Sequence, residues 1–279
     1  MPRPVILGIC RFSYLGQSDF AAFRGRPERT EEFLAGVAAD LYADNRMAAR
    51  FHAFETICLP SVLAQRQPGF VFLVVTSTRM PAPWLNRLRG LCDGHDEIQL
   101  LVTDETDLSD ALRPTLLELH KASDGDLVQF RLDDDDALAV DYILRLRGLA
   151  RRMAGIDQYA ISFARGLNVA LYPGQAMALL EMNLPFLGGG LAMRMANPQQ
   201  SLFTRPHFRA GQQMTSLIAH DAPATLLLRW PSDSRALDLN QLPPYLTRLD
   251  PAAFDASLNR HFPFLAGIDF DGLRPAHWA

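Results

Sequence analysis

Leu127-Val128-Gln129-Phe130-Arg131-Leu132-Asp133-Asp134-Asp135-Asp136-Ala137 is the stretch that decides the fold. It begins with an apolar run that predicts a buried strand, and an apolar stripe at helical spacing follows over residues 139–153. The four adjacent carboxylates between them repel one another, so fixing them at a strand end is unfavourable unless a cation binds there. The stretch therefore predicts an α/β protein with a cation site at the edge of its sheet.

Other interpretations explain less of the acidic run. Asp136 could cap a helix that starts at Ala137, which accounts for one or two of the four carboxylates. An EF-hand loop counted from Asp133 would need Gly and Glu where the chain has Leu138 and Leu144. A solvated acidic turn remains an open alternative.

The first half of the chain alternates strand and helix patterns. Short apolar, β-branched runs predict strands, and stripes at helical spacing predict helices between them. The strands are expected over residues 5–9, 70–76, 98–102 and 127–132, and the helices over residues 45–65, 84–92 and 108–119, with Pro60 breaking or kinking the first of these. This alternation predicts an open, mostly parallel sheet with helices on both faces and ligands at the carboxyl ends of the strands.

The pattern changes after residue 155. Residues 158–165 and 168–172 predict a hairpin around Gly166, and residues 177–183 and 191–195 predict further strands. The glycines at 188–190 could form a flexible loop or let the backbone approach a ligand. We expect residues 1–155 and 156–279 to be two halves of one domain, the second with a mixed sheet.

Composition narrows the classes of function. The 279 residues carry a net charge of −4, so there is no basic field that would attract nucleic acid. All basic residues but Lys121 are Arg, and phosphate contacts are therefore expected from Arg. Three widely spaced Cys predict free thiols, and we expect a cytoplasmic protein without a transmembrane segment, with any membrane contact peripheral.

Asp133 and Asp135 form a D-x-D pattern. Alternate residues on an extended segment point to the same side, so both carboxylates could reach one ligand. Because the candidate ligands are oxygens, Mn²⁺ or Mg²⁺ is expected rather than Zn²⁺. Asp136 is an additional candidate metal ligand.

The succession of strand, D-x-D and helix resembles a GT-A-type nucleotide-sugar glycosyltransferase, with its Rossmann-like sheet. The resemblance narrows to a bacterial rhamnosyltransferase family on three segments: Arg11-Phe12-Ser13, residues 50–61 (RFHAFETICLPS) with Gln65 after them, and residues 131–138 (RLDDDDAL). It implies a metal-dependent enzyme that moves a sugar, rhamnose by the family's label, from a nucleotide-diphosphate sugar to a glycan or another hydroxyl acceptor. Residues 1–155 would then bind the donor and residues 156–279 the acceptor, which could bring the protein to a membrane.

The resemblance also implies roles for individual residues. Asp135 would ligate the metal, and Asp133 would lie near the donor ribose or the metal, with Asp134 and Asp136 as the alternatives if the register differs by one. His220 would be a further metal ligand, like the late His of some GT-A enzymes. The place of a base-reading carboxylate is taken by Thr76-Ser77-Thr78. The expected donor-binding residues are Arg11, Phe12, Ser13, Thr76, Arg131, Asp133 and Asp134. Phe12, Tyr14 and Trp230 could stack on a base or a sugar.

No general base stands out in the second half. The candidates for a base that takes the acceptor's proton are Glu181, Asp221, Asp233 and Asp255, with Glu181 and Asp221 preferred. A retaining enzyme would not need such a base. A nucleotidyl- or phosphotransferase using the same metal–phosphate chemistry, and a non-catalytic metal-binding module, remain open as alternatives.

Overall fold

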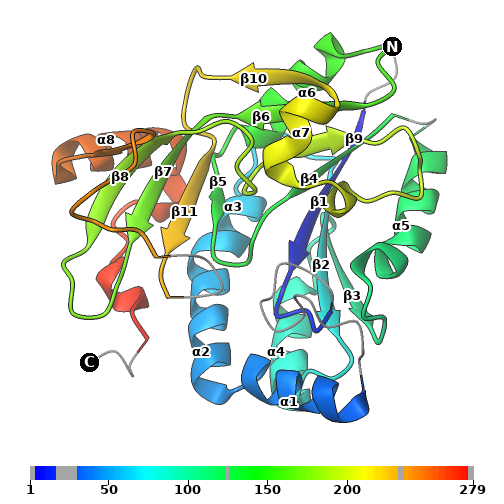
Figure 1. Cartoon of the computed structure of the whole chain (residues 1–279), viewed down its shortest axis with the longest axis horizontal. Coiled ribbons are helices and arrows are strands. Elements are labelled where there is room, and N and C mark those ends of the chain that lie inside the picture. The colour runs from blue at the N-terminus through cyan, green and yellow to red at the C-terminus, as the bar shows by residue number, and fades with distance from the viewer. Residues whose placement is uncertain (1–3, 17–29, 124–125, 232–235, 276–279) are drawn as a thin grey trace.

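The computed structural model describes residues 4–16, 30–123, 126–231 and 236–275, which form two sheets and the helices around them (Figure 1). The larger sheet has the strand order β10-β6-β9-β4-β1-β2-β3. Its strands are β1 (Val5–Arg11), β2 (Val71–Ser77), β3 (Ile98–Thr103), β4 (Leu127–Arg131), β6 (Tyr159–Phe163), β9 (Ala192–Arg194) and β10 (Thr215–Ala219). Strand β9 is antiparallel to both neighbours, and the other neighbouring pairs are parallel.

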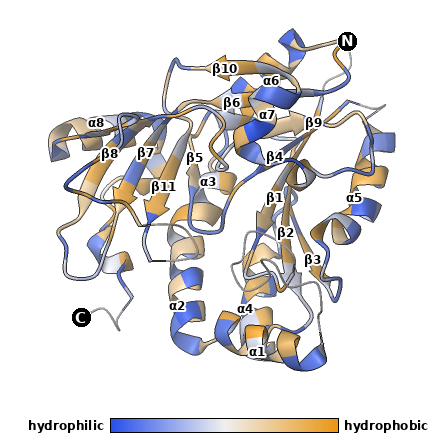
Figure 2. Cartoon of the chain, viewed as in Figure 1, coloured by the Kyte–Doolittle hydropathy of each residue, from blue (hydrophilic) through white to orange (hydrophobic). Residues whose placement is uncertain are grey.

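Helices cover both faces of the larger sheet. The α-helices are α1 (Glu31–Leu41), α2 (Asp44–Ala53), α3 (Leu59–Leu63), α4 (Ala82–Cys92), α5 (Leu108–Ala122), α6 (Tyr142–Arg152), α7 (Ala210–Gln213) and α8 (Pro251–His261). Side chains of α1, α2, α4 and α6 share one core with the sheet, whereas α5 packs on the opposite face. Figure 2 shows the result as hydrophobic strands beside helices with one hydrophobic and one hydrophilic side. The expected fold class, an open and mostly parallel α/β sheet, is confirmed.

A second, mixed sheet lies in the C-terminal half, as expected. Its strand order is β12-β8-β7-β11-β5, and only β7 and β11 pair in parallel. Its strands are β5 (Ala137–Leu138), β7 (Arg165–Ala170), β8 (Ala178–Asn183), β11 (Thr225–Arg229) and β12 (Leu246–Arg248). Helix α8 packs against this sheet through Phe254 and Leu258. The division of the chain at residue 155 into a donor half and an acceptor half stays a prediction.

A helix, α6, follows the acidic run as the stripe over residues 139–153 predicts, but the alternative in which it starts at Ala137 is wrong. Ala137 and Leu138 form the short strand β5, which pairs antiparallel with Leu226 and Thr225 of β11, and α6 begins only at Tyr142. Asp136 is therefore not a helix cap. Pairing with a strand almost ninety residues away outweighed the local helical pattern, as long-range contacts often do.

The hairpin expected over residues 158–172 is also wrong. Strand β6 pairs with β9 and β10 in the larger sheet, while β7 pairs with β8 and β11 in the smaller one. The chain passes from one sheet to the other at Ala164, whose backbone N–H donates to the carbonyl of Ala219 at 2.9 Å. The two strands diverge because each has a partner from later in the chain.

Pro60 does not end the helix that precedes it. A π-helical segment, Phe54–Cys58, joins α2 to α3, and Pro60 lies in the first turn of α3. The backbone at Cys58 and Leu59 is helical, so the helix continues through Pro60, and the missing N–H falls next to the π segment, where the regular hydrogen-bond pattern is already changed. The extra residue of a π turn is typical of functional positions in helices, and Arg50 lies one turn before it.

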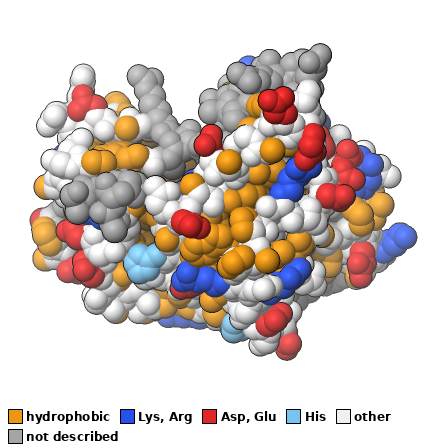
Figure 3. All heavy atoms as spheres, turned by 90° about the horizontal axis from the view of Figure 1, so that it is seen from below, with side chains coloured by type: hydrophobic (Ala, Val, Ile, Leu, Met, Phe, Trp, Pro, Cys, Tyr) orange, Lys and Arg blue, Asp and Glu red, His pale blue; other side chains and the backbone are white. Residues whose placement is uncertain are grey.

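The charged surface and the buried cysteines are those of a globular protein. Figure 3 shows, on the face seen from below, hydrophobic side chains in the middle with both signs of charge around them. Cys10, Cys58 and Cys92 are buried and unpaired, which confirms the expectation of free thiols. None of the helices in the described ranges combines the length and apolar character that crossing a lipid bilayer requires.

Candidate functional site

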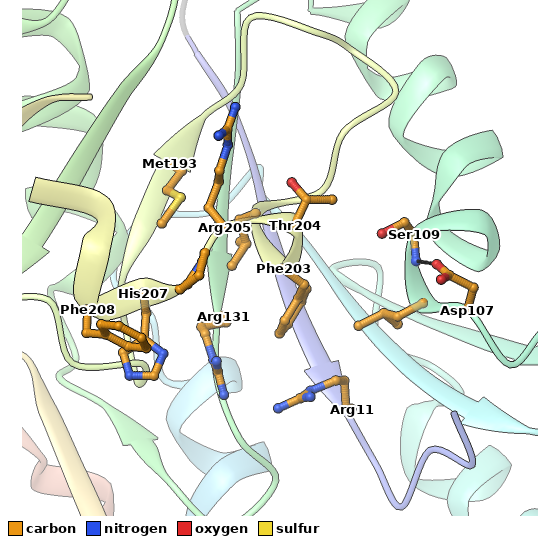
Figure 4. A pocket seen from close by; sticks show the side chains of 13 residues that line it. Arg11, Asp107, Ser109, Arg131, Met193, Phe203, Thr204, Arg205, His207 and Phe208 are labelled. Carbon is orange, nitrogen blue, oxygen red and sulfur yellow. Dashed lines mark hydrogen bonds between the residues drawn. The ribbon is translucent and has the colours of Figure 1, made fainter. Parts of the chain in front are cut away.

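Two arginines from adjacent strands enter one cavity at the carboxyl edge of the larger sheet. Arg11 is the last residue of β1 and Arg131 the last of β4, and both line a cavity of about 340 Å³. The ring of Phe203, from a short 3₁₀ helix (Leu202–Thr204), lies at 4.8 Å from the Arg11 guanidinium carbon and 5.3 Å from that of Arg131. In Figure 4 both guanidiniums extend toward the same side of the cavity, past the edge of Phe203. The edge thus presents two cations around an aromatic ring.

Asp133 lies beside these arginines. Its Oδ1 is 3.2 Å from Nη2 of Arg131 and 3.6 Å from Nη2 of Arg11, and its side chain is 39% exposed, the most of the four carboxylates. Although shielding from solvent acts to raise it, the Arg131 and Arg11 guanidiniums hold the pKa of Asp133 well below its usual range. Asp133 is therefore a carboxylate that stays ionised next to the cavity.

Asp134 and Asp135 turn inward and share Arg50, which comes from α2. Arg50 Nη1 donates to Oδ2 of Asp135 at 2.6 Å, and Nη2 lies 3.1 Å from Oδ1 of Asp134. The indole Nε1 of Trp230 donates to the same Oδ2 of Asp135 at 2.7 Å. Burial raises the pKa of Asp134 to about 7, although Arg50 acts against the shift. Arg50 and Trp230 thus fix the orientation of the D-x-D segment.

Asp136 belongs to the second sheet rather than to the cavity. It is 7% exposed, and its Oδ1 accepts a hydrogen bond from the backbone N–H of Leu228 at 3.2 Å. Burial and then the neighbouring Asp135 and Asp133 raise the pKa of Asp136 well above its usual value. Asp136 therefore acts here as a link between the acidic run and β11.

The carboxylates do not form a closed metal cage. Among the described residues there is no group of three or more His, Cys, Asp or Glu side chains placed to hold a metal ion. Mg²⁺, however, is commonly bound through one or two carboxylates, with substrate phosphates and water completing the shell. Asp133, ionised at the cavity, and Asp135, whose Oδ1 has no hydrogen bond among the described residues, fit that arrangement.

The glycines at 188–190 wrap the backbone around Arg131. A Cβ on Gly188 would approach Cζ of Arg131 at 3.2 Å, and one on Gly189 would lie 3.3 Å from a carboxylate oxygen of Asp136. Gly190 donates its N–H to the Arg131 carbonyl at 2.9 Å and has φ of +72°, a backbone conformation that favours glycine. Of the two interpretations left open for this run, close backbone approach is the one the geometry supports, and the group approached is a protein side chain.

Three further residues of the expected donor set lie behind the cavity. Phe12 is fully buried against Phe51 and Phe54, with ring centroids 4.7 Å and 5.0 Å apart. Thr76 is likewise buried, and among the described residues its Oγ1 has no hydrogen-bond partner. Ser13 has φ of +43° and accepts a hydrogen bond from Nη1 of Arg46 at 3.1 Å. These residues support the edge of the sheet and do not line the cavity.

The other two aromatic residues expected to stack on a ligand, Tyr14 and Trp230, are also engaged by protein groups. The hydroxyl of Tyr14 donates to the carbonyl of Glu105 at 2.6 Å, and the indole of Trp230 is bonded to Asp135. Both side chains are about 5% exposed or less. Because the rings of Tyr14 and Trp230 are buried, neither has an exposed face on which a base or a sugar could stack.

The candidate bases lie away from the cavity. Glu181 forms an ion pair with Arg165, and Asp221 pairs with Arg145 at 2.8 Å. His220 Nδ1 lies 3.2 Å from Oδ1 of Asn183 on the same side of the molecule. Asp255 is exposed on α8, and Asp233 lies outside the described residues. None of the described candidate bases lines the cavity beside Arg11 and Arg131. Their catalytic roles stay predictions.

The cavity contains residues that sequence reasoning missed. His207 and Phe208 lie at one end of the cavity, Asp107 and Ser109, at the start of α5, lie at the other, and Phe203 lies between them. They come from segments far from the acidic run in the sequence, in a stretch rich in Pro and Arg. For Phe203, His207 and Phe208 the signal that could have selected them is electrostatic, because residues 182–220 contain no Asp or Glu.

Comparisons with known proteins bear on this site. A family model described as "Putative rhamnosyl transferase" matches residues 5–238. No curated protein matches the chain. Among solved structures, the chain is similar to S. aureus TarS 1-349, at 11% identity and a TM-score of 0.39, over 80% of this chain and 60% of that one. The chain thus spans less than two thirds of that TarS structure.

Two further solved structures are similar at the same level. TarS 1-349 in complex with UDP shows 12% identity and a TM-score of 0.40, over 96% of this chain and 76% of that one. A structure titled "putative nucleotide-diphospho-sugar transferase", from Desulfovibrio desulfuricans G20, shows 10% identity and a TM-score of 0.40, over 98% and 97%.

Proposed function

Because the chain belongs to the putative rhamnosyl transferase family, a family of glycosyltransferases, we propose that it moves a sugar from a nucleotide-diphosphate sugar to a hydroxyl of an acceptor. The observation that supports this proposal best is the pair Arg11 and Arg131 in one cavity at the carboxyl edge of β1 and β4. Ligands of open α/β sheets bind at this edge. The family's description makes rhamnose the first donor sugar to test.

The two arginines suit a diphosphate. A guanidinium offers a planar set of N–H donors that matches phosphate oxygens, and it stays charged at any physiological pH. Arg11 and Arg131 are each mostly buried, so their charges are screened less by solvent than those of exposed arginines. We assign the donor's diphosphate to the space beside these two side chains.

The bond changes of the reaction create charge that Arg11 and Arg131 can stabilise. The acceptor oxygen forms a bond to the anomeric carbon and its proton passes to a carboxylate or to water, while the bond from that carbon to the diphosphate oxygen breaks with its electron pair on the diphosphate. Negative charge therefore grows on the leaving group while positive charge grows on the sugar. Arg11 and Arg131 would stabilise the first charge, because both already line the cavity that we assign to the diphosphate.

We further propose that Asp133 and Asp135 hold Mg²⁺ or Mn²⁺. A divalent cation supplies positive charge at the leaving diphosphate when it is bound. Arg50 and Trp230 orient Asp135, and Arg131 and Arg11 keep Asp133 ionised. These contacts prepare two carboxylate oxygens without building a complete cage.

The experiment is a calorimetric titration of the full chain with UDP, GDP and dTDP, with and without MnCl₂, followed by turnover assays with the matching nucleotide sugars. Variants R11Q and R131Q are expected to weaken nucleotide binding about 10–100-fold, a loss of about 1.4–2.8 kcal/mol each. The matched control is R113Q on α5, an exposed arginine that pairs with Asp110 on the same helix. Binding of a nucleotide that is unchanged in R11Q and R131Q would refute the assignment of the diphosphate.

A further inference from the structure

One wall of the cavity has a one-sided charge. Residues 202–208 line this wall and Arg209 follows them directly; we call residues 202–209 the cationic wall, and they include two short 3₁₀ helices, Leu202–Thr204 and His207–Arg209. The wall lies within residues 182–220, which contain no Asp or Glu although the chain has 31 of these residues. Among the described residues, neither Arg205 nor Arg209 has a carboxylate within ion-pair distance. The positive charge of this wall is therefore not balanced by nearby acids in the described part of the chain.

The cationic wall also exposes an aromatic ring. Phe208 is 63% exposed, the most exposed of the large hydrophobic side chains reported for the described residues. The imidazole of His207 meets it edge-on, with ring centroids 5.5 Å apart and an interplanar angle of 89°. The guanidinium carbon of Arg209 lies 5.7 Å from the ring centroid. An open ring face thus stands beside two groups that can bind an anion.

The opposite end of the cavity has a different character. There Asp107 caps α5 and accepts hydrogen bonds from the backbone N–H groups of Ser109 at 2.8 Å and Asp110 at 3.3 Å. Figure 4 shows Asp107 and Ser109 at one end, His207 and Phe208 at the other, and Arg11 and Arg131 between them. An anionic ligand other than the diphosphate is therefore favoured at the end formed by His207 and Phe208.

We propose that the cationic wall binds the acceptor, and that this acceptor is a carbohydrate carrying an anionic group, a phosphate or a carboxylate. The inference rests on the proposed function, which assigns the space beside Arg11 and Arg131 to the donor. Phe208 packs against the apolar face of a sugar ring, and His207 and Arg209 bind the anionic group. The cavity volume of about 340 Å³ is in the range of small-molecule sites.

The test is a titration of the full chain with glucose 6-phosphate, glucuronate, glucose and vesicles of phosphatidylglycerol, each with and without a nucleoside diphosphate. The charged sugar that is the better ligand is expected to bind at least about tenfold more tightly than glucose. Variants F208A and R209Q are expected to reduce that binding about tenfold and to change nucleotide affinity less than about twofold. The matched controls are L144A, an exposed leucine on α6, and R89Q, an exposed arginine on α4, and neither should change binding.

The outcomes separate this inference from the proposed function. Equal binding of charged and neutral sugars, or full binding by F208A and R209Q, would overturn the inference. Binding of vesicles without binding of either charged sugar would overturn it in favour of a membrane surface. The relative binding of phosphate and carboxylate sugars identifies the anionic group. Failure of UDP, GDP and dTDP to bind would instead count against the proposed function. The titrations of sugars without nucleotide would still test whether the cationic wall binds a charged sugar.

Discussion

Replacing Arg50 with Gln removes the guanidinium that forms ion pairs with both Asp134 and Asp135. Asp134 is 1% exposed, and neither of its oxygens accepts a hydrogen bond among the described residues. Asp135 would keep only the Trp230 N–H on its Oδ2. R50Q therefore leaves two adjacent buried carboxylates without the cation that now lies between them.

The expected loss of unfolding free energy is about 3–5 kcal/mol, the range found when one partner of a buried ion pair is removed. Proton uptake limits the loss, since the pKa of Asp134 is already raised to about 7 and would rise further without Arg50. The loss should therefore be largest at pH 8 and smaller at pH 6. With a urea m-value near 3 kcal/mol/M, about 3 kcal/mol corresponds to a midpoint lowered by about 1 M.

The measurement is urea unfolding followed by tryptophan fluorescence at pH 6 and pH 8, with EDTA present. The matched control is R87Q, which removes an arginine paired with Glu55 at 2.7 Å, where the arginine side chain is 44% exposed. An exposed pair of this kind contributes about 1 kcal/mol or less. The double variant R50Q/D134N should recover at least half of the loss, because a neutral amide side chain at this position needs no cation.

Two results would refute this reasoning. A loss below about 1 kcal/mol in R50Q would show that the pair contributes no more than an exposed one. A double variant as unstable as R50Q itself would show that the buried charge of Asp134 is not the cause. Either result would also remove the argument that Arg50 orients the D-x-D segment.

Three further predictions concern single groups. Asp134 has a pKa raised to about 7 from 3.8, so its contribution to stability is complete below about pH 4 and is lost as the pH rises through 7. D134N, which does not titrate, should therefore gain stability relative to the parent between pH 5 and pH 8, by at least ~2 kcal/mol in urea unfolding, and a constant difference would contradict this. G188A places a Cβ 3.2 Å from Cζ of Arg131, so nucleotide affinity in calorimetry should fall about 3–10-fold, and an unchanged affinity would show that the guanidinium is free to shift. G148A, at an exposed position inside α6 where a Cβ would meet nothing within 4 Å, should leave nucleotide affinity unchanged and raise the unfolding free energy by about 0.5–1 kcal/mol, and a fall in stability would contradict the propensity argument.

The sequence predicted those parts of the fold that local pattern determines. The runs at residues 5–9, 70–76, 98–102 and 127–132 all became strands of the larger sheet, because each is too apolar to remain at the surface. The errors arose where a distant partner decided the outcome. Ala137 and Leu138 became a strand through β11, and β6 and β7 separated because β9, β10 and β11 pair with them.

The candidate site was predicted in part for the same reason. Arg11, Arg131 and Asp133 lie together because parallel strands end at the same edge, which the order of strands along the chain indicates. Adjacent carboxylates, in contrast, cannot be assigned directions from sequence alone. The directions depend on Arg50 and Trp230, which come from α2 and from the segment after β11.

The position of β9 has a consequence for how the protein emerges from the ribosome. Residues 192–194 lie between β4 and β6, both of which are synthesised well before them. A nascent chain that ends at residue 155 lacks the strand that covers the open side of β4, and it also exposes β5 without its partner β11. Such an intermediate presents unpaired strand edges to neighbouring chains, so chaperone contact during translation should be concentrated before residue 229 has left the exit tunnel.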